Sequence, residues 1–471
     1  MISRRQWMLT AGTLAAGALN AESGVASEAA VSEKEISFTR TLPIRYDVDV
    51  FIAGGGPAGT AAAVAARSRG ARVFLAEAHS CFGGMGTAGR VPVFMQMSDG
   101  EHFLCGGYGK TVVDTLKKDR LFPGPATDIE SLKRVYDLLV KESGTDFTFY
   151  TTFCETVVSG GHIDAVICVA PTGMFAVRAK VYIDATGNGD LAVRAGAKFE
   201  KGDAEGHMMP GSLCSLWSGI DWAKWNAARP KGIPQPQGYK LKQAIQDGVF
   251  SVPDEHFTGV AELGGNLGGA NIGHVFGVDG TDERSITDAL LCGRRSMKEF
   301  TRYFNEYLEG FEEAKMVDTG SLLGIRETRR ILGDYVLSLD DYKKRAVFPD
   351  EIGRYAYPID IHPLSPNAVN LERHRKEFDQ EFRYAKGESY GIPYRTLTPV
   401  GWDNLLTAGR CISSDHYVHG SVRVMPGCFI TGQASGMAAA LAVESKQSVH
   451  DIDVKKLQTC LKDFGAYLPN A

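Results

Sequence analysis

One glycine-rich segment near the N-terminus constrains the fold of this chain more than any other feature. The apolar residues 48–52 predict a buried strand, and the pattern Gly54-x-Gly56-x-x-Gly59 follows directly. An alanine-rich helix and a second apolar strand come next along the chain. This order of strand, tight turn, helix and strand is the βαβ unit of a doubly wound α/β fold.

Each glycine of the pattern has a role in binding a dinucleotide. Gly54 permits the tight turn, Gly56 lets the backbone approach a pyrophosphate, and Gly59 lets helix and strand pack closely. The helix N-terminus offers N–H groups and a positive dipole end to phosphates. Glu77 lies 18 residues after Gly59 and is expected to accept hydrogen bonds from the adenosine ribose. The residues predicted to bind the cofactor here are Gly54, Gly56, Pro57, Ala58, Gly59 and Glu77.

Three further segments favour FAD over NAD as the cofactor. The loop 81–89 resembles the G-G-x-x-T element of FAD enzymes, and the strand 181–184 leads into an A-T-G motif like that of two-dinucleotide-binding-domain flavoproteins. An ordinary β-turn is the alternative for this motif. After a last strand and a loop, 411–424, a helix begins at Met425, where its N-terminus would stabilise a negative charge on reduced flavin. The residues predicted here are Gly83, Gly84, Thr87, Ala185, Thr186, Gly187, Gly409, Arg410 and Met425.

From residue 46 to about residue 444 the chain resembles the bacterial FAD-dependent oxidoreductases of the glutathione-reductase-like superfamily. These proteins are loosely similar to the flavin subunit of heterodisulfide reductase. The segments 324–333, 357–362, 390–395, 409–413 and 420–426 contribute to the resemblance. It implies redox chemistry with FAD, held covalently or not, and it does not name the substrate.

We therefore predict an α/β fold with a discontinuous, Rossmann-like, three-layer FAD-binding domain. Its two parts are expected at 45–200 and 400–471. Between them, residues 201–399 are expected to form an inserted α+β substrate-binding region with a helix at 287–307.

The N-terminus has the pattern of a bacterial export signal. Arg4 and Arg5 precede a short, weakly apolar stretch that is too rich in Gly, Ala and Thr to span a membrane. We expect a twin-arginine signal peptide at 1–26, a linker at 27–44, and delivery by the export machinery to the periplasm or cell envelope. A basic N-terminal helix that stays attached is the alternative.

Composition excludes some functions. The net charge is −5, and no stretch concentrates Lys and Arg, so nucleic-acid binding is not expected. None of the nine cysteines forms a C-x-x-C pair, the usual spacing for zinc ribbons, iron–sulfur clusters and redox dithiols, and no metal site is expected. Flavin-linked thiol–disulfide exchange, which would use thiols such as Cys81, Cys411 and Cys428, therefore ranks last among the alternatives.

Histidine is the usual base in a flavin-dependent dehydrogenation, because its pKa lies near working pH. His419 and His416 lie in the predicted loop before the flavin-facing helix, so one of them is the leading candidate; a backbone-bonded loop histidine is an equal alternative. Arg326, Arg329 and Arg423 are candidates for clamping a carboxylate or binding the flavin, although Arg326 could instead join a structural ion-pair network with Glu327 and Arg330. His274 and His362 are weaker candidates, and Trp217, Tyr355 and Tyr357 could stack on a sugar or aromatic substrate or simply pack in the core.

The predicted function is that of an FAD-dependent dehydrogenase acting on a small organic substrate, hydroxylated or sugar-like, by hydride transfer to flavin. Electrons would pass on to a quinone, a small carrier protein or oxygen. A second hypothesis is an FAD-binding structural or assembly protein without turnover.

Overall fold

The structure is a computed structural model that describes residues 36–118, 128–233, 235–366 and 368–471. It divides into two units, Met1–Thr41 and Leu42–Ala471. The described residues of the first unit, 36–41, have no regular secondary structure. The predicted signal peptide and the first half of the predicted linker, residues 27–35, lie outside the described residues. All elements below belong to the second unit.

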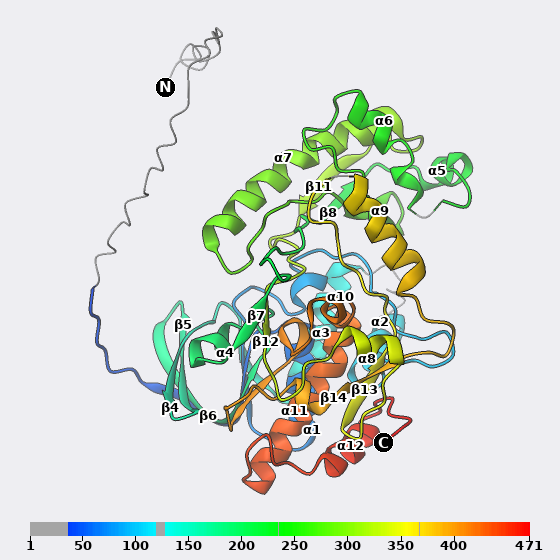
Figure 1. The fold of residues 1–471 in the computed structure, drawn as a ribbon. Helices are drawn as coiled ribbons and strands as arrows, with labels where there is room; N and C mark the ends of the chain where they lie inside the picture. The colour runs from blue at the N-terminus through cyan, green and yellow to red at the C-terminus, as the bar shows by residue number, and fades with distance from the viewer. Residues whose placement is uncertain (1–35, 119–127, 234, 367) are drawn as a thin grey trace, which may run out of the picture. The chain divides into compact units, whose positions relative to one another are not determined.

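The described residues include a seven-stranded mixed sheet (Figure 1). Its order is β3-β2-β1-β6-β5-β4, and β15 pairs with the far end of β6. Neighbours from β3 to β6 and β15 run parallel, whereas β4, β5 and β6 form an antiparallel meander. The strands are β1 (Ile44–Ala53), β2 (Val73–Ala76), β3 (Asp146–Thr148), β4 (Thr152–Ser159), β5 (His162–Ala170), β6 (Gly173–Asp184) and β15 (Leu405–Thr407). The predicted α/β class is confirmed, and β1 begins at Ile44, the last residue of the predicted linker.

Two helices pack tightly against each other on this sheet. They are α1 (Pro57–Ser68) and α11 (Met425–Ser445), where the sequence predicted them. A Cβ added at Gly432 would lie 2.2 Å from the carbonyl oxygen of Ala58, and one at Gly436 would lie 2.1 Å from that of Ala62. Only glycine permits such close approach of two helix backbones. Helices α2 (Tyr108–Lys118), α3 (Ile129–Glu142) and α12 (Val454–Asp463) pack around this pair.

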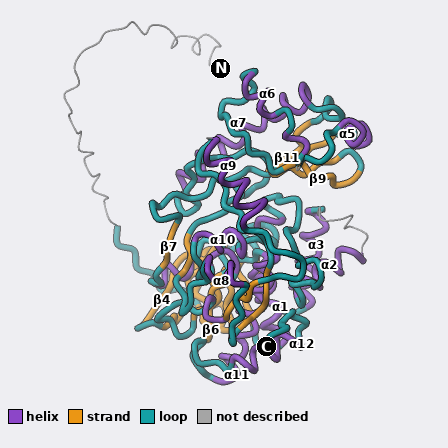
Figure 2. Tube along the Cα trace, turned by 45° about the vertical axis from the view of Figure 1, so that its right-hand side comes forward, coloured by secondary structure: helices purple, strands orange, loops and turns teal. Residues whose placement is uncertain are grey.

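A four-stranded antiparallel sheet forms a second part of the molecule, at the top of Figure 1 and again at the top of Figure 2. Trp217 is fully buried there, edge-on to Phe304 at 4.7 Å, so it belongs to a core. The elements are β8 (Ser215–Ser218), β9 (Gly259–Gly264), β10 (Leu267–Asn271), β11 (Lys315–Thr319), α5 (Trp222–Ala228), α6 (Leu241–Gln246) and α7 (Glu283–Tyr307). Helix α7 begins four residues before the predicted start, because Asp282 caps it by accepting the Ser285 N–H.

The later part of the predicted insertion does not join this second sheet. Tyr342, Ile352 and Tyr355 pack into the same hydrophobic core as α1 and α11. Tyr342 lies in α8 (Leu339–Lys344), and Ile352 and Tyr355 lie in β13 (Glu351–Tyr355), which pairs with β14 (Tyr390–Pro393). Helix α9 (Ala368–Lys376) lies between these two strands along the chain. The region 201–399 is therefore divided between two cores, with Tyr355 in the one that supports the FAD elements.

The remaining short elements connect these parts. The pair β7 (Phe199–Lys201) and β12 (Arg329–Ile331) is antiparallel, and α4 (Asp190–Ala195) follows β6. The predicted loop 411–424 is wrong in its centre, where α10 (His416–Val422) forms. Asp415 begins this helix by accepting the Val418 N–H at 2.7 Å.

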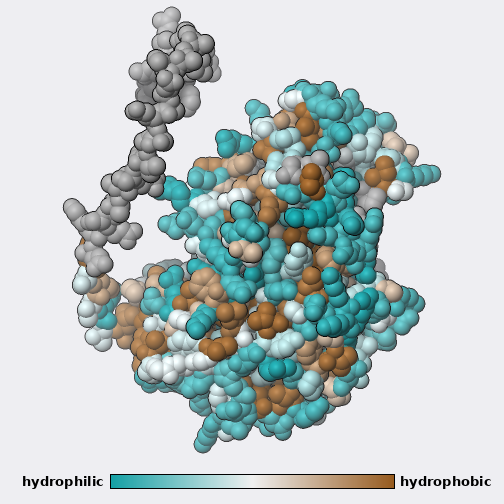
Figure 3. Space-filling view, in the orientation of Figure 1, coloured by the Kyte–Doolittle hydropathy of each residue, from teal (hydrophilic) through white to brown (hydrophobic). Residues whose placement is uncertain are grey.

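The face of the molecule in Figure 3 is mostly polar, with apolar side chains in small groups. In the part of the chain that the structure describes, no helix is both long and apolar enough to cross a bilayer.

Candidate active site and cofactor cavity

A cavity of about 940 Å³ lies where the predicted glycine elements meet. This volume is at the upper end of the range usual for ligand sites. Most of the predicted cofactor residues line it, while Gly59, Gly83 and Thr87 are not among the lining residues. The predicted residues on its wall are Gly54, Gly56, Pro57, Ala58, Glu77, Gly84, Ala185, Thr186, Gly187, Gly409, Arg410 and Met425.

The three fingerprint glycines have different surroundings. Gly54 has φ +92°, and a Cβ there would lie 2.7 Å from the carbonyl oxygen of Ala185. A Cβ at Gly59 would lie only 1.9 Å from the carbonyl oxygen of Gly54. A Cβ at Gly56, by contrast, would meet nothing within 4 Å and would project into open space. Gly54 and Gly59 are thus required by the protein's own packing, and Gly56 leaves room for a ligand.

The acid after β2 is held in place by backbone amides. Glu77 is buried and lines the cavity, and its Oε2 accepts the Gly55 N–H at 2.6 Å. Its Oε1 accepts the His79 N–H at 2.7 Å. Each carboxylate oxygen has a second lone pair. The side chain is therefore fixed at the cavity wall and can still accept a hydroxyl of a bound ribose.

The loop after this acid docks on the fingerprint turn. The Gly83 N–H donates to the Gly55 carbonyl at 2.8 Å, and the Thr87 hydroxyl donates to the Phe82 carbonyl. A Cβ at Gly83 would lie 2.6 Å from the Thr87 side chain. Gly83 and Thr87 therefore stabilise the conformation of this loop without lining the cavity. Gly84 is the predicted residue of the loop that lines it.

Arg410 ties the A-T-G turn to two other segments. Its Nε donates to the Gly187 carbonyl at 2.8 Å, its Nη1 to the Ile325 carbonyl, and its Nη2 to Asn188 Oδ1 at 2.6 Å. All three nitrogens are engaged within the protein. Arg410 thus holds the cavity wall together, and the sequence did not distinguish this role from direct binding.

The N-terminus of α11 lies at the cavity with free backbone donors. Val424, which precedes it, has no capping side chain, and Pro426 has no N–H. The first N–H groups of a helix lack partners inside the helix, and they carry the positive end of its dipole. Val424, Met425 and Cys428 line the cavity. This end of the helix is suited to an anionic group or a reduced flavin.

These residues fit FAD on the geometry of the chain alone. Two helix N-termini, a glycine with open space at its Cβ, and a fixed acid surround one cavity large enough for a dinucleotide. The family model for "FAD dependent oxidoreductase" matches residues 49–461. The chain belongs to this family. FAD is its cofactor, and it is an enzyme.

Solved structures provide a second comparison, at low identity. A geranylgeranyl bacteriochlorophyll reductase-like protein from Thermoplasma acidophilum has TM-score 0.43 and 11% identity, over 89% of this chain and 84% of that one. A p-nitrophenol 4-monooxygenase from Pseudomonas putida has TM-score 0.43 and 12% identity, with the same coverage. A flavin-dependent brominase has TM-score 0.41 and 12% identity, over 88% and 83%. No curated protein matches the chain.

The FAD-dependent oxidoreductase has a charged cluster on the same cavity wall, outside the dinucleotide elements. It consists of Arg326, Tyr357, Asp360, His362 and Arg423. We call these five residues the polar cluster. The sequence singled out Arg326 and Arg423 and ranked His362 and Tyr357 lower. Asp360 was missed as a site residue, and the only available signal was its place in the segment 357–362 that carries the family resemblance.

Arg326 directs part of its guanidinium toward the cavity. Its Nη1 donates to the Pro210 carbonyl at 2.8 Å and to Ser212 Oγ at 3.0 Å. Its Nε and Nη2 have no hydrogen-bond partner among the described residues. Burial and the neighbouring Arg423 lower the Arg326 pKa to about 10, so it stays charged at neutral pH. Arg326 therefore does not join a structural ion-pair network, which was the alternative role given for it above.

Asp360 is the carboxylate that balances this positive charge. Its Oδ2 lies 3.4 Å from Arg423 Nη2, and it also contacts His362 Nε2 at 3.3 Å. Burial alone would raise the pKa of Asp360, but His362 and Arg423 beside it hold the pKa well below its ordinary value. Asp360 is therefore ionised throughout the neutral range, and the cluster keeps a net positive charge from its two arginines.

The two leading base candidates lie elsewhere, because they belong to helix α10 and not to a loop. His416 Nδ1 contacts Glu327 Oε1 at 2.8 Å, and Arg330 Nη1 donates to the same oxygen at 2.8 Å. His419 is fully buried and its Nε2 lies 3.1 Å from the Arg410 carbonyl. Neither lines the cavity. His419 has the backbone contact of the alternative given for it, whereas His416 is paired with a carboxylate.

The sequence also pointed to Arg329 and to cysteine thiols. Arg329 Nη1 pairs with Asp190 Oδ1 at 2.9 Å and does not line the cavity. The thiols of Cys214 and Cys428 do line it, but all nine cysteines are free. Burial raises the pKa of Cys428 to about 12 and that of Cys214 to about 11. Both thiols therefore stay protonated near neutral pH, which disfavours thiol–disulfide exchange.

Proposed function

We propose that this FAD-dependent oxidoreductase dehydrogenates a small hydroxylated organic acid, such as a sugar acid. The observation that carries the proposal is the single cavity that joins the dinucleotide elements to the polar cluster. When bound, FAD supplies a two-electron acceptor for the hydride of the substrate. The electrons would then pass to a quinone, a carrier protein or oxygen.

The two guanidiniums support an anionic substrate. Arg326 and Arg423 both line the cavity, and Arg326 has two nitrogens without a partner among the described residues. A guanidinium binds a carboxylate strongly, because charge-assisted hydrogen bonds are about twice as strong as neutral ones. Tyr357 lines the same wall, and its phenol is a further donor or acceptor. Burial raises the Tyr357 pKa, so the phenol keeps its proton.

His362 is the cavity histidine that would accept the hydroxyl proton, in place of His416 or His419. Burial and the nearby Arg326 lower its pKa well below the ordinary value, so it is neutral near pH 7. A neutral imidazole on the wall has a lone pair for the proton that leaves when a hydroxyl becomes a carbonyl. Arg326 and Arg423 would hold the substrate while this proton moves.

The test is an anaerobic titration of the purified holoenzyme, followed by its flavin absorbance. We expect bleaching by a hydroxylated acid and binding about 10- to 100-fold weaker for the matching neutral polyol, since one charged hydrogen-bond partner is lost. The same preference should disappear in an Arg326→Met variant. Bleaching by neutral polyols alone would overturn the anionic assignment, and a flavin that no substrate class bleaches would overturn the dehydrogenase.

We also propose export by the twin-arginine route, which is supported by Arg4 and Arg5 ahead of a short apolar stretch. An enzyme that folds around FAD before export suits a pathway for folded proteins. We expect the wild type in the periplasmic fraction of expressing cells and an Arg4→Lys, Arg5→Lys variant in the cytoplasm. Equal distribution of the two proteins would contradict the proposal.

A further inference from the structure

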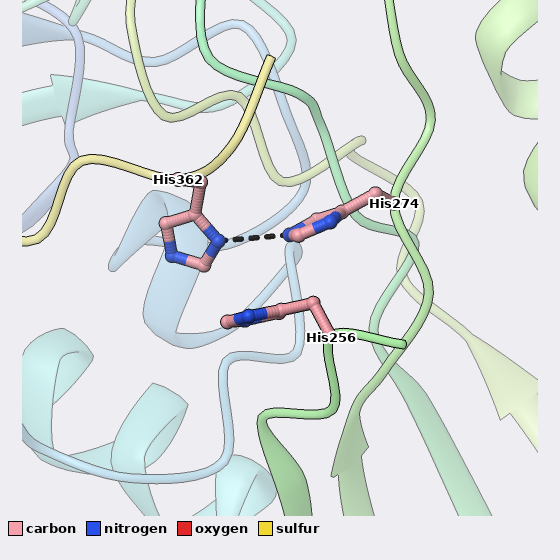
Figure 4. Close-up of side chains that lie close together, drawn as sticks. All are labelled: His256, His274 and His362. Atoms are coloured by element: carbon pink, nitrogen blue, oxygen red, sulfur yellow. Dashed lines mark hydrogen bonds between the residues drawn. The ribbon is translucent and has the colours of Figure 1, made fainter. Parts of the chain in front are cut away.

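Three loops from separate parts of the chain bring a row of buried polar groups up to the polar cluster. Asp254 and His256 precede β9, His274 follows β10, and His362 follows β13. His274 Nε2 and His362 Nδ1 lie 2.8 Å apart, the dashed contact in Figure 4. His274 Nδ1 lies 3.0 Å from Asp254 Oδ2. The row therefore runs Asp254, His274, His362 and ends at the cavity.

The contact with Asp254 indicates where the protons along this row lie. Asp254 Oδ2 and His274 Nδ1 have no aligned hydrogen-bond partner among the described residues, and their 3.0 Å contact is the nearest polar approach that either atom has. A carboxylate can only accept, so the proton between them belongs on His274 Nδ1. A neutral His274 then has a lone pair on Nε2. The proton in the 2.8 Å contact must come from His362 Nδ1, which leaves the lone pair of His362 on Nε2.

That Nε2 lies 3.3 Å from both carboxylate oxygens of Asp360, at the long end of hydrogen-bond distances. Asp254 lies closer to the row, 3.0 Å from His274 Nδ1, so we infer that Asp254 sets the order of the protons and that His362 Nε2 keeps its lone pair. His362 and Asp360 line the cavity, whereas His274 does not. A substrate hydroxyl can therefore approach the free lone pair, and Asp360 stands beside the positive charge that forms when the proton arrives.

We propose that Asp254 and His274 are positioning residues that hold His362 as the Nδ1–H tautomer, so that its Nε2 serves as the base of the dehydrogenation proposed above. The arrangement extends the logic of a Ser–His–Asp triad, where a buried carboxylate fixes the tautomer of the reacting imidazole. The proton of the substrate passes to His362 Nε2. Both imidazoles then donate along the row, and Asp254 and Asp360 stabilise the cation at either end.

The groups around the row shift the pKa values of its histidines in opposite directions. His256 stacks on His274, and the ring centroid of His374 lies 5.4 Å from that of His362. Burial lowers the pKa of both His274 and His362, with Arg326 adding to the effect, while Asp254 opposes the change at His274. The two imidazoles of the row are thus neutral at rest, and His362 gains its proton from the substrate.

A metal centre is the rival explanation, since ring nitrogens of His256, His274 and His362 lie within 4.8 Å of one another. The rings of His256 and His274 are nearly parallel, at 17° with centroids 4.6 Å apart, as Figure 4 shows. An imidazole binds a metal along a lone pair in its own plane, so two stacked rings do not converge on one ion. A dication would also lie near the Arg326 guanidinium. The geometry favours a proton-carrying row.

An Asp254→Asn variant tests the row, because it reverses every proton in it. The other oxygen of Asp254 accepts the His256 N–H at 3.0 Å, so this contact will keep the amide oxygen of Asn there and turn its NH₂ toward His274. His274 must then accept at Nδ1 and donate from Nε2. His362 Nδ1 becomes the acceptor, its proton moves to Nε2, and the base is lost.

The first measurement is ¹⁵N NMR of histidine-labelled holoenzyme without substrate, with His274→Gln and His362→Gln variants for assignment. We expect both rings as Nδ1–H in the wild type and as Nε2–H in Asp254→Asn, with FAD content unchanged. Unchanged tautomers in the variant, or His362 already Nε2–H in the wild type, would overturn the row. So would a stoichiometric metal in the purified protein that shifts both rings.

The second measurement is the rate of flavin bleaching by the substrate found in the titration, as a function of pH. Reversal of the tautomer in a triad lowers the rate about 10⁴-fold, so we expect a loss on the order of 10³–10⁴-fold in Asp254→Asn. The exposed Asp340→Asn, which removes only a surface contact to Lys344, should keep the wild-type rate and profile. Wild-type bleaching by Asp254→Asn would overturn the positioning role. If no substrate is found, the proposed function fails and the NMR result still decides the row.

Discussion

A Gly56→Leu variant is expected to fold normally and to be purified without FAD. The leucine side chain would enter open space, since a Cβ at this position meets nothing within 4 Å, and the backbone there has φ −65°, which any residue adopts. The loss of glycine before the helix should cost the protein about 1 kcal/mol or less. The same side chain would occupy the place where the backbone approaches the pyrophosphate. We expect FAD affinity to fall at least about 100-fold, or about 2.8 kcal/mol.

Gly59→Ala is the contrasting variant. It adds only a methyl group, but at a position where the protein's own packing leaves no room for a Cβ. Its Cβ would lie 1.9 Å from the Gly54 carbonyl oxygen, so helix α1 must move away from β1. We expect this variant to lose stability as well as FAD. Urea unfolding and titration of the apoprotein with FAD, followed by flavin fluorescence, measure the two effects separately. A Gly56→Leu protein that binds FAD like the wild type, or that is unfolded, would contradict the assignment.

The sequence predicts the FAD elements well because each of them is a local pattern. Gly54 and Gly56 stand between β1 and α1, and Gly59 lies in the first turn of α1. The structure forms both elements there, although β1 begins at Ile44, four residues before the predicted strand. The start of α11 at Met425 follows from Pro426 one residue later, which is favourable in the first turn of a helix. In these cases the signal and the structure lie within a few residues of each other.

The base candidates were misplaced for an equally local reason. His416 and His419 were taken as loop residues, but Asp415 caps a short helix and turns them toward Glu327 and Arg410. A capping aspartate ahead of them was the available signal. The row at His362 is different, because it joins loops that are 88 residues apart along the chain. No spacing rule relates Asp254, His274 and His362, so only the tertiary structure could bring them together.

The boundary of the substrate-binding region was hard to predict for a physical reason as well. Aromatic residues are frequent throughout 201–399, yet Trp217 packs in the second sheet while Tyr342 and Tyr390 pack with α1 and α11. An aromatic side chain is equally suited to either core, because its burial depends on area and not on the identity of its neighbours. The sequence therefore indicates that such residues are buried, without indicating in which core.

Acid is expected to destabilise the holoenzyme steeply below about pH 6.5, because several histidines are buried in the neutral form. Burial lowers the pKa of His362 and His419 well below the ordinary value, with Arg326 and Arg330 respectively adding to the effect. The pKa values of His256 and His274 are lowered as well, mainly by burial. Below pH 6.5 the unfolded chain therefore binds protons that the folded chain does not, so stability falls as the pH falls.

As the pH falls, each such histidine lowers the free energy of unfolding by up to about 1.4 kcal/mol per pH unit. This loss continues over the range between the histidine's pKa in the unfolded chain and its lower pKa in the folded protein. His419→Gln tests one of them, since the amide can replace the contact to the Arg410 carbonyl without titrating. We expect the slope of unfolding free energy between pH 6 and pH 5 to fall by about 1.4 kcal/mol per unit, measured in urea with saturating FAD. The exposed His207→Gln is the control and should leave the slope unchanged. Equal slopes for His419→Gln and the wild type would mean that His419 is protonated in the folded protein, and its buried contacts would then have to be reassigned.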